Sequence, residues 1–174
     1  PYKKIASHVL GYLSELTVEE LARERDKGYK LGDLIGKSGI EKQYETYMRG
    51  RDGIQTVVKD NLGMIQEKVG ERSPEIGHSV VLTIDIDLQT FIEDLIKDYR
   101  GTVGVVDLTT GGILALVSKP NFSPEFFSRT FNRKEWLGLV NDPDKPLHNK
   151  FSQGRYSPGS VFKIVMALAG LQEK

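Results

Sequence analysis

Three observations predict an α+β fold in two parts. Capped helix signals alternate along the chain with strand signals, which is typical of helices packed on an antiparallel sheet. A stretch rich in proline, glycine and charge, "ERSPEIGHS", interrupts the chain. The longest apolar runs all lie after that stretch. We therefore expect one part at residues 1–76 and a second at 77–174.

Composition narrows the function classes. Lysine plus arginine equals aspartate plus glutamate, 24 against 24, so nothing indicates nucleic-acid binding or an acidic tail. The absence of cysteine excludes a disulfide framework and thiolate metal sites, without assigning a compartment. The longest apolar run, residues 164–171, is too short to span a bilayer, and residues 1–12 lack a signal-peptide pattern. We expect any membrane anchor to lie upstream of this chain, which looks like a fragment.

Capping boxes predict two helices in the first part. Thr17 with Glu20 opens "LTVEELARERDKG", and Ser38 with Glu41 opens "GIEKQYETYMRG". In the second of these, apolar residues fall on one face and Gly50 is placed to end the helix.

Strands are predicted on both sides of the break. Residues 54–69 alternate and contain a turn signal, so they predict a β-hairpin. Beyond the break, "SVVLTIDI" at 79–86 predicts a strand. Asp87 is placed to cap an amphipathic helix in "LQTFIEDLIKDY", at residues 88–99.

The rest of the second part predicts a hairpin, a long loop and a helix. Two apolar runs, "TVGVVDL" and "ILALVS", are joined by "TTGG" and predict the central strands of a buried antiparallel hairpin. Residues 119–157 are polar and punctuated by proline, with a short helix expected at "RKEWLGLV". Four aromatic residues there either line a groove or, more commonly for such residues, anchor the core and loops. They are Phe126, Phe127, Phe131 and Trp136.

The apolar stretch after the last Pro-Gly turn holds one unexpected residue. Lys163 is the only polar side chain in residues 161–169. A helix that is apolar on all sides is normally buried, where a lysine is costly unless it has a use. Ser160 precedes it by three residues, so the two side chains share one face of a helix. Of the eleven serines, only Ser160 has a lysine at that spacing.

This pair has what a serine nucleophile needs. A serine hydroxyl is weakly nucleophilic until a base removes its proton, and burial can make a lysine neutral enough to be that base. At the first turn of a helix, free backbone N–H groups can stabilise an oxyanion. We predict Ser160 as the nucleophile and Lys163 as its general base. The alternative is that Ser160 only caps the helix and Lys163 extends from its first turn to solvent.

Other motifs give weaker signals. "GDLIGKSG" is one residue too short between its glycines for a phosphate-binding loop, so a turn into a helix is the better interpretation. Asp85 and Asp87 lie two residues apart at a predicted strand end, but Asp87 is better explained as a helix cap than as half of a catalytic carboxylate pair. The three histidines lack partners at metal-ligand spacing, which leaves structural or surface roles for His8, His78 and His148. We predict no metal site and no cofactor.

At Ser160 the sequence resembles a known family. "YSPGSVFK" is similar to the S-x-x-K motif of serine D,D-transpeptidases, the class B penicillin-binding proteins of the elongation type. Further stretches resemble the opening strand and helix, the central hairpin and the approach to the nucleophile in their transpeptidase domain. These are "VVLTIDIDLQTFIEDLI", "GTVGVVDLTTGGILALVSKPNFSPEFF" and "NDPDKPLHNKFSQGRYSPGS". Upstream, "ASHVLGY" and "GKSGIEKQYETYMRGRDG" resemble the non-catalytic pedestal, with Gly36, Gly39 and Glu41 matching its G-x-x-G-x-E element.

The resemblance implies a mechanism and partners. Ser160 would attack the penultimate D-alanine carbonyl of a peptidoglycan stem peptide, with its own backbone N–H as one oxyanion donor and Lys163 as the base. An amine from a neighbouring strand would resolve the acyl-enzyme into a cross-link, and a β-lactam would acylate the same serine. The resemblance also implies a membrane glycosyltransferase and scaffold proteins as partners, on the periplasmic side of the cytoplasmic membrane.

The sequence departs from the family pattern in one respect. The S-x-N and K-[ST]-G elements normally follow S-x-x-K, and neither is found between Ser160 and Lys174. We therefore expect the pedestal at 1–76 and an incomplete transpeptidase domain at 77–174. Two alternatives stay open: a β-lactam sensor or serine β-lactamase, and an interaction module whose pedestal docks onto the elongation machinery.

Overall fold

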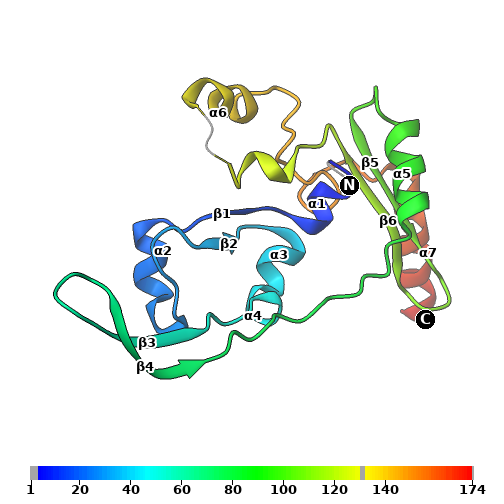
Figure 1. Cartoon of the computed structure of the whole chain (residues 1–174). Coiled ribbons are helices and arrows are strands. Elements are labelled where there is room, and N and C mark those ends of the chain that lie inside the picture. The colour runs from blue at the N-terminus through cyan, green and yellow to red at the C-terminus, as the bar shows by residue number, and fades with distance from the viewer. Residues whose placement is uncertain (1–3, 130–131, 174) are drawn as a thin grey trace.

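A computed structural model describes residues 4–129 and 132–173 of the chain. It mixes helices with three two-stranded antiparallel sheets, which confirms the predicted α+β class. Figure 1 shows two groups of elements, one around β1–β4 and one around β5–β6, with α1 between them. The short helix α1 therefore lies where the two groups meet, in contact with both α3 and β6.

The first group is built from short helices and strands. They are α1 (Ser7–Leu10), β1 (Leu13–Glu15), α2 (Val18–Arg23), the 3-10 turn η1 (Arg25–Lys27), β2 (Leu34–Gly36), α3 (Gly39–Gln43), α4 (Glu45–Met48), β3 (Ile54–Lys59) and β4 (Ile65–Arg72). The capping box of Thr17 and Glu20 is present in both directions at α2, as predicted. The hairpin predicted at 54–69 is confirmed as β3 paired with β4.

The second predicted helix is wrong in two details. The Ser38 side chain makes no capping hydrogen bond. The helix also divides at Tyr44, which ends α3 and begins α4. Directly after the division, the Glu45 carboxylate accepts hydrogen bonds from the Gly36 N–H at 2.8 Å and from the Tyr29 hydroxyl at 2.9 Å, which hold α4 to the preceding segments.

Close backbone contact joins α1 to α3 and explains two glycines. A Cβ on Gly11 would lie 1.9 Å from the Ser38 carbonyl oxygen. A Cβ on Gly39 would lie 2.5 Å from the Val9 carbonyl oxygen. Both residues also have positive φ, +85° and +59°. Only glycine meets both requirements without strain, so Gly11 and Gly39 are needed for the close packing of α1 against α3.

The second group contains α5 (Ile86–Leu95), β5 (Gly101–Val106), β6 (Ile113–Lys119), the 3-10 turn η2 (Pro124–Phe126), α6 (Arg133–Val140), the 3-10 turn η3 (Gly159–Val161) and α7 (Phe162–Gln172). The central hairpin is confirmed, with β5 paired to β6 from Gly101↔Lys119 to Val106↔Ile113. The short helix expected at "RKEWLGLV" is confirmed as α6.

Helix α5 packs on β6 and forms the core of this group. Ile92, Ala115 and Val117 are buried there. Partly buried apolar residues surround them: Leu88, Ile96, Val103 and Val105. Of the apolar stripe predicted for residues 88–99, Ile92 and Ile96 pack on the hairpin. Phe91 and Leu95 are each 63% exposed and Tyr99 is 69% exposed, so the rest of the predicted stripe is wrong.

The start of α5 corrects two predictions. The strand predicted at 79–86 does not form, because the segment meets β6 at single points rather than along a ladder. The Asp85 N–H donates to the Leu114 carbonyl at 2.8 Å, and the Thr83 hydroxyl donates to the Ile113 carbonyl at 2.7 Å. The cap is Asp85, whose carboxylate accepts from the Asp87 and Leu88 N–H groups. Asp87 lies inside the first turn, so it is not the cap.

Candidate functional site

Ser160 and Lys163 lie at the entry to the last helix. The entry is the 3-10 turn η3, and α7 begins at Phe162. A 3-10 turn has three residues per turn, so Ser160 and Lys163 lie on the same side of the helix. Ser160 is in the first turn, where backbone N–H groups have no acceptor within the helix. The predicted juxtaposition of the two residues is therefore compatible with the backbone.

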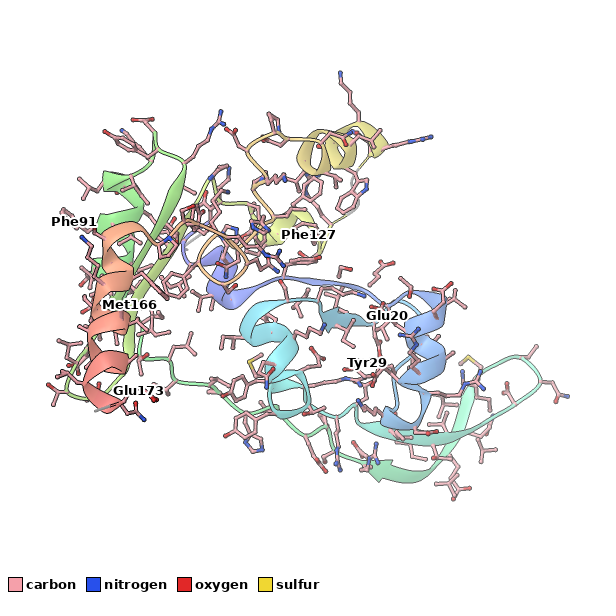
Figure 2. All side chains as sticks on the ribbon, turned by 180° about the vertical axis from the view of Figure 1, so that it is seen from behind. Glu20, Tyr29, Phe91, Phe127, Met166 and Glu173 are labelled. Carbon is pink, nitrogen blue, oxygen red and sulfur yellow. The ribbon has the colours of Figure 1, made fainter. Side chains whose placement is uncertain are left out.

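The predicted burial of this helix is wrong for the described chain. Every described residue from Arg155 to Glu173 is exposed. Met166 and Leu168 have exposed fractions of 59% and 63%, and Figure 2 shows Met166 on α7. No residue of the described ranges gives Ser160 or Lys163 a side-chain hydrogen bond or ion pair. The desolvation that a neutral lysine needs is thus not supplied by the described residues.

The chain reaches Ser160 through a compact segment, residues 141–153, which we call the approach lobe. A single β6 side chain attaches it to the sheet, because the Ser118 hydroxyl accepts the Lys150 N–H at 3.0 Å. Inside the lobe, Lys150 Nζ donates to the carbonyls of Asp144 at 2.9 Å and Lys145 at 3.3 Å. Burial lowers the pKa of Lys150, whose ammonium group is used to fold the lobe.

The approach lobe also packs against a glycine of β5. A Cβ at Gly104 would lie 2.3 Å from the Phe151 ring, so a larger residue there would displace the ring. Arg100, just before β5, pairs with Asp144 at 2.8 Å. The lobe is therefore fixed to both strands of the hairpin before the chain continues to Ser160.

A buried carboxylate connects α5 to the N-terminal segment. Glu93 accepts hydrogen bonds from the Ala6 N–H at 2.7 Å and from the Gln89 amide at 3.0 Å. It also accepts from Lys119 Nζ at 3.2 Å and from the Asn121 amide at 2.7 Å. With 7% of the Glu93 side chain and 11% of the Lys119 side chain exposed, this ion pair is almost fully desolvated. A buried charge of this kind is stable only when its partners are all present.

A histidine of α1 reaches the approach lobe. His8 Nε2 lies 2.8 Å from the Pro146 carbonyl oxygen, and since a carbonyl only accepts, Nε2 carries the proton. The imidazole meets the Phe122 ring edge-on at 5.1 Å. Burial lowers the pKa of His8, with Lys150 acting in the same direction. The sequence predicted a structural or surface role for His8, and it bridges the two parts of the structure.

The four aromatic residues of the long loop divide by position. Phe127 is buried and stacks on Tyr12 at 3.8 Å, so it anchors η2 to the start of β1. Its ring lies edge-on to Trp136 of α6 at 6.3 Å, and Figure 2 shows Phe127 between these elements. This confirms the anchoring interpretation for Phe127. Phe131 lies outside the described residues.

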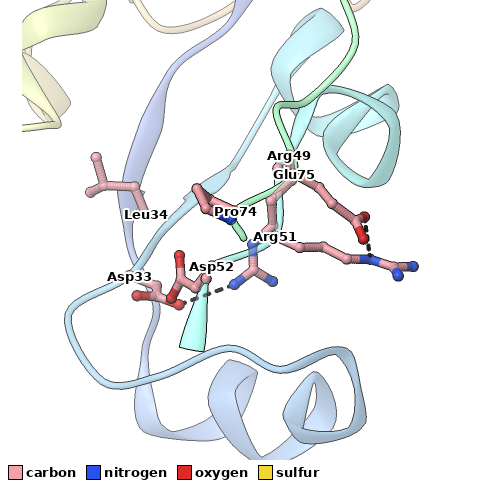
Figure 3. Close-up of a pocket in the computed structure, with 9 residues that line it drawn as sticks. Asp33, Leu34, Arg49, Arg51, Asp52, Pro74 and Glu75 are labelled. Carbon is pink, nitrogen blue, oxygen red and sulfur yellow. Dashed lines mark hydrogen bonds and ion pairs between the residues drawn. The ribbon is translucent and has the colours of Figure 1, made fainter. Parts of the chain in front are cut away.

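A polar pocket of about 570 Å³ lies in the first group of elements (Figure 3). Its charged residues pair with one another. Arg49 contacts Asp33 at 3.1 Å, and Arg51 contacts Glu75 at 3.7 Å. The Asp52 carboxylate forms an ion pair with Lys30 Nζ at 2.8 Å. These charged side chains of the pocket are therefore already engaged in ion pairs.

Sequence reasoning missed the contacts between distant segments. Nothing in the local pattern links Ala6 to Glu93, or His8 to Pro146, because those partners come from different elements. One signal was available: Glu93 and Gln89 both fall on the apolar side of the amphipathic α5, where polar residues need partners.

The described residues form neither a metal site nor a membrane span. Within residues 4–129 and 132–173, no group of three or more potential metal ligands comes together. No helix in these ranges is both apolar enough and long enough to cross a membrane.

Comparison with known families gives two matches that divide the chain. The family model of the penicillin-binding protein dimerisation domain matches residues 1–82. The model of the penicillin-binding protein transpeptidase domain matches residues 101–174. Ser160 and Lys163 both lie in the second match.

Curated relatives resemble the chain over nearly all its length. The peptidoglycan D,D-transpeptidase MrdA of Escherichia coli K12 is 38% identical over 98% of the chain. Penicillin-binding protein 3 of Bacillus subtilis is 34% identical over 99% of the chain. The chain spans only 28% and 25% of these two proteins.

Solved structures give the same picture. PBP2 of Helicobacter pylori, in complex with MreC, matches 99% of the chain with a TM-score of 0.85 and 28% identity. PBP2 of Pseudomonas aeruginosa, in complex with WCK 5153, matches 97% of the chain with a TM-score of 0.80 and 32% identity. The chain covers 32% and 34% of these two structures.

Proposed function

Because the chain belongs to the penicillin-binding protein family, we propose that it forms part of a peptidoglycan D,D-transpeptidase in which Ser160 is the nucleophile. The observation that carries this proposal is the S-x-x-K pair at the entry to α7, inside the transpeptidase match. The similarity to MrdA and to PBP2 structures favours a role in elongation. A peptidoglycan substrate implies the periplasmic side of the cytoplasmic membrane.

The proposed reaction has two steps. Ser160 Oγ bonds to the penultimate D-alanine carbonyl carbon, while its proton passes to Lys163 Nζ. The C–N bond to the terminal D-alanine then breaks, and Lys163 returns the proton to the leaving amine. The amine of a second stem peptide attacks the ester and regenerates Ser160. A β-lactam would stop at the first step, because ring opening leaves no group that departs.

Local structure supports the oxyanion part of this scheme. The Ser160 N–H belongs to the first turn of η3, where it is free to donate to a developing negative charge. Mutagenesis of such donors in other enzymes typically costs a factor of about 10² to 10³ in rate. The second donor is expected from a K-[ST]-G strand of the family, outside the described residues.

We infer that α7 is covered in the working enzyme. Its apolar residues are exposed on every side, including Ile164, Met166, Leu168 and Leu171. A helix of this composition is normally a core helix. The surface that covers it would desolvate Lys163 and favour its neutral form, which is the form that acts as a base. We assign the pedestal to residues 1–76 and the transpeptidase part to 77–174.

Intact-mass analysis after incubation with a penicillin tests the proposal. Ser160→Ala should abolish the adduct, whereas Ser157→Ala, a change of a nearby exposed serine, should leave it. Lys163→Ala should slow acylation by at least about a hundredfold, since general bases contribute 10² to 10⁴. An adduct that survives Ser160→Ala would contradict the assignment. Fast hydrolysis of the adduct would favour a β-lactamase instead.

A second function, docking of a scaffold protein, has one observation in its favour. The H. pylori PBP2 neighbour was solved in complex with MreC. We infer a scaffold partner of this kind for the pedestal, residues 1–76. Binding to purified scaffold protein should survive Ser160→Ala, because the nucleophile takes no part in it. If Ser160→Ala abolished binding while the protein stayed folded, the docking hypothesis would be wrong.

A further inference from the structure

Two non-glycine residues of the described chain have a strained backbone conformation. Among residues 4–129 and 132–173, only Ala6 and Lys145 are non-glycine residues with positive φ, at 54° and 49°. This left-handed conformation is unfavourable for residues with a Cβ. It persists where the surrounding structure fixes the backbone, and such residues concentrate at functional sites.

Hydrogen bonds fix both strained residues. The Ala6 N–H donates to the buried Glu93 carboxylate at 2.7 Å. The Lys145 carbonyl accepts from Lys150 Nζ at 3.3 Å and from the His148 N–H at 3.0 Å. Ala6 therefore belongs to the α5 side of the contact and Lys145 to the approach lobe.

One hydrogen bond connects these two sides. His8 follows Ala6 closely on α1, and Pro146 directly follows Lys145. The His8 Nε2–H donates to the Pro146 carbonyl at 2.8 Å. The Asn121 amide adds a second connection to the N-terminal segment, because it donates to the Lys4 carbonyl at 3.1 Å and to Glu93 at 2.7 Å. The pedestal thus holds the lobe through a side chain that α1 presents.

The lobe leads directly to the nucleophile. Its other supports come from the sheet and the residue before β5: the Ser118 hydroxyl, the packing of the Phe151 ring against Gly104, and the Arg100–Asp144 ion pair. After the lobe, residues 155–173 are exposed, so no described packing fixes Ser160 independently. The placement of Ser160 relative to the sheet therefore depends on how the lobe is held.

We propose that His8 is a positioning residue, which couples the pedestal to the nucleophile by fixing the approach lobe between two strained residues, Ala6 and Lys145. This inference rests on the proposed function of Ser160 and deepens it. His8 touches neither substrate nor reacting atoms. It sets the orientation in which Ser160 enters α7, so a change at His8 alters the rate of acylation rather than the affinity for the acylating agent.

The test is acylation of the full-length protein by a fluorescent penicillin, with the first-order acylation constant separated from the initial dissociation constant. His8→Phe keeps a ring against Phe122 but loses the N–H donor. His8→Gln keeps an N–H donor. His78→Phe is the matched control, because His78 stacks on Tyr47 in the pedestal at 4.7 Å, away from the lobe. Thermal melts verify that each variant is folded.

The proposal expects His8→Phe to lower the acylation constant about three- to tenfold, as for one hydrogen bond, with the dissociation constant unchanged within about twofold. His8→Gln should recover most of the rate, and His78→Phe should match the wild type. A folded His8→Phe that acylates at the wild-type rate would overturn the proposal. So would equal losses in His8→Phe and His8→Gln.

A second pair of variants covers failure of His8→Phe to fold. His8→Gln and His8→Asn are both polar, but the asparagine amide is one methylene shorter and is expected to fall short of the Pro146 carbonyl. His8→Asn should then acylate more slowly than His8→Gln, and equal rates would contradict the positioning role. Failure of the proposed function gives a different result, because the wild-type protein itself would then form no adduct at Ser160.

Discussion

The contact around His8 and the helix that carries Ser160 place a charged side chain in opposite environments, one buried and one exposed. At the first, Glu93 is buried with four donors around its carboxylate, among them Lys119 and the Ala6 N–H. At the second, Lys163 stands on an apolar helix that is exposed on every side. We call the first region, residues Ala6, His8, Glu93, Lys145 and Pro146, the interdomain joint.

The difference shows which environment the chain completes by itself. A buried carboxylate is tolerable only with its hydrogen bonds satisfied, and the described residues around Glu93 supply all four of its donors. The apolar face of α7 gains nothing from water, yet no described element covers it. In the described chain, the connection between the two parts therefore has its hydrogen bonds satisfied, whereas the helix that carries the nucleophile has its apolar surface exposed.

Removal of the central carboxylate should have the largest effect. Glu93→Ala leaves the Lys119 ammonium group buried without its ion-pair partner, in addition to the Ala6 N–H and two side-chain amides. We expect a loss of about 3–5 kcal/mol in the free energy of unfolding, measured by urea titration. Glu67→Ala, on an exposed position of β4, is the control and should change stability by less than about 0.5 kcal/mol.

A steric clash between α1 and the start of α3 should have the second largest effect on stability. Gly11 ends α1, and a Cβ there would lie 1.9 Å from the Ser38 carbonyl oxygen at φ +85°. Gly28 has a similar φ of +77° with nothing within 4 Å. Gly28→Ala should therefore cost only the backbone strain, about 1 kcal/mol. Gly11→Ala should cost at least about 3 kcal/mol in the same urea titration, because α1 must move. Similar losses in both variants would show that the contact yields easily.

Local signals were enough to predict much of the chain. The Thr17–Glu20 box and the hairpin of β5 and β6 depend on neighbours in sequence, so their patterns are complete in one stretch. The spacing of Ser160 and Lys163 was likewise visible, because i and i+3 share a face in any helix.

Predictions failed where a distant partner decides the outcome. Asp85 and not Asp87 caps α5, because the Asp85 backbone is held by Leu114 of β6. The expected strand at 79–86 has apolar residues, but it meets β6 only through Thr83 and Asp85 and forms no ladder. Burial of α7 was predicted from its composition, and composition does not say which residues do the covering. The His8–Pro146 bond leaves no periodic pattern in the sequence at all.

Lowering the pH should destabilise the interdomain joint by less than the two substitutions above. Burial lowers the pKa of His8 below its usual value of 6.5, opposed by the Pro146 carbonyl and Glu93 and assisted by Lys150 and His148. The neutral ring is therefore favoured in the folded state. Its contribution to stability is complete above pH 6.5 and is lost as the pH falls from there through the lowered pKa.

Urea titrations between pH 7.5 and pH 5 would measure this loss. The slope of stability against pH should be smaller in His8→Gln, which does not titrate, than in the wild-type chain. His78→Gln is the control, since it removes a histidine that stacks on Tyr47, away from the joint. An identical slope in His8→Gln and wild type would mean that His8 is not desolvated in solution.

The smallest effect is expected on α7, and it tests the other side of the comparison. Leu168 has an exposed fraction of 63%, so Leu168→Gln should change the stability of residues 1–174 by less than about 0.5 kcal/mol. Ile92→Gln, in the buried core under β6, should cost several times more and is the matched control.

The same two variants give a different result in the full-length protein if α7 is a core helix there. A leucine that becomes buried typically contributes about 2–5 kcal/mol, so Leu168→Gln should then destabilise nearly as much as Ile92→Gln. A penicillin adduct on Ser160 that forms in the full-length protein and fails to form in residues 1–174 would give the same answer for Lys163. If Leu168→Gln stayed neutral in both proteins, the helix would be exposed in the enzyme too. Lys163 would then lack the desolvation that a neutral base requires.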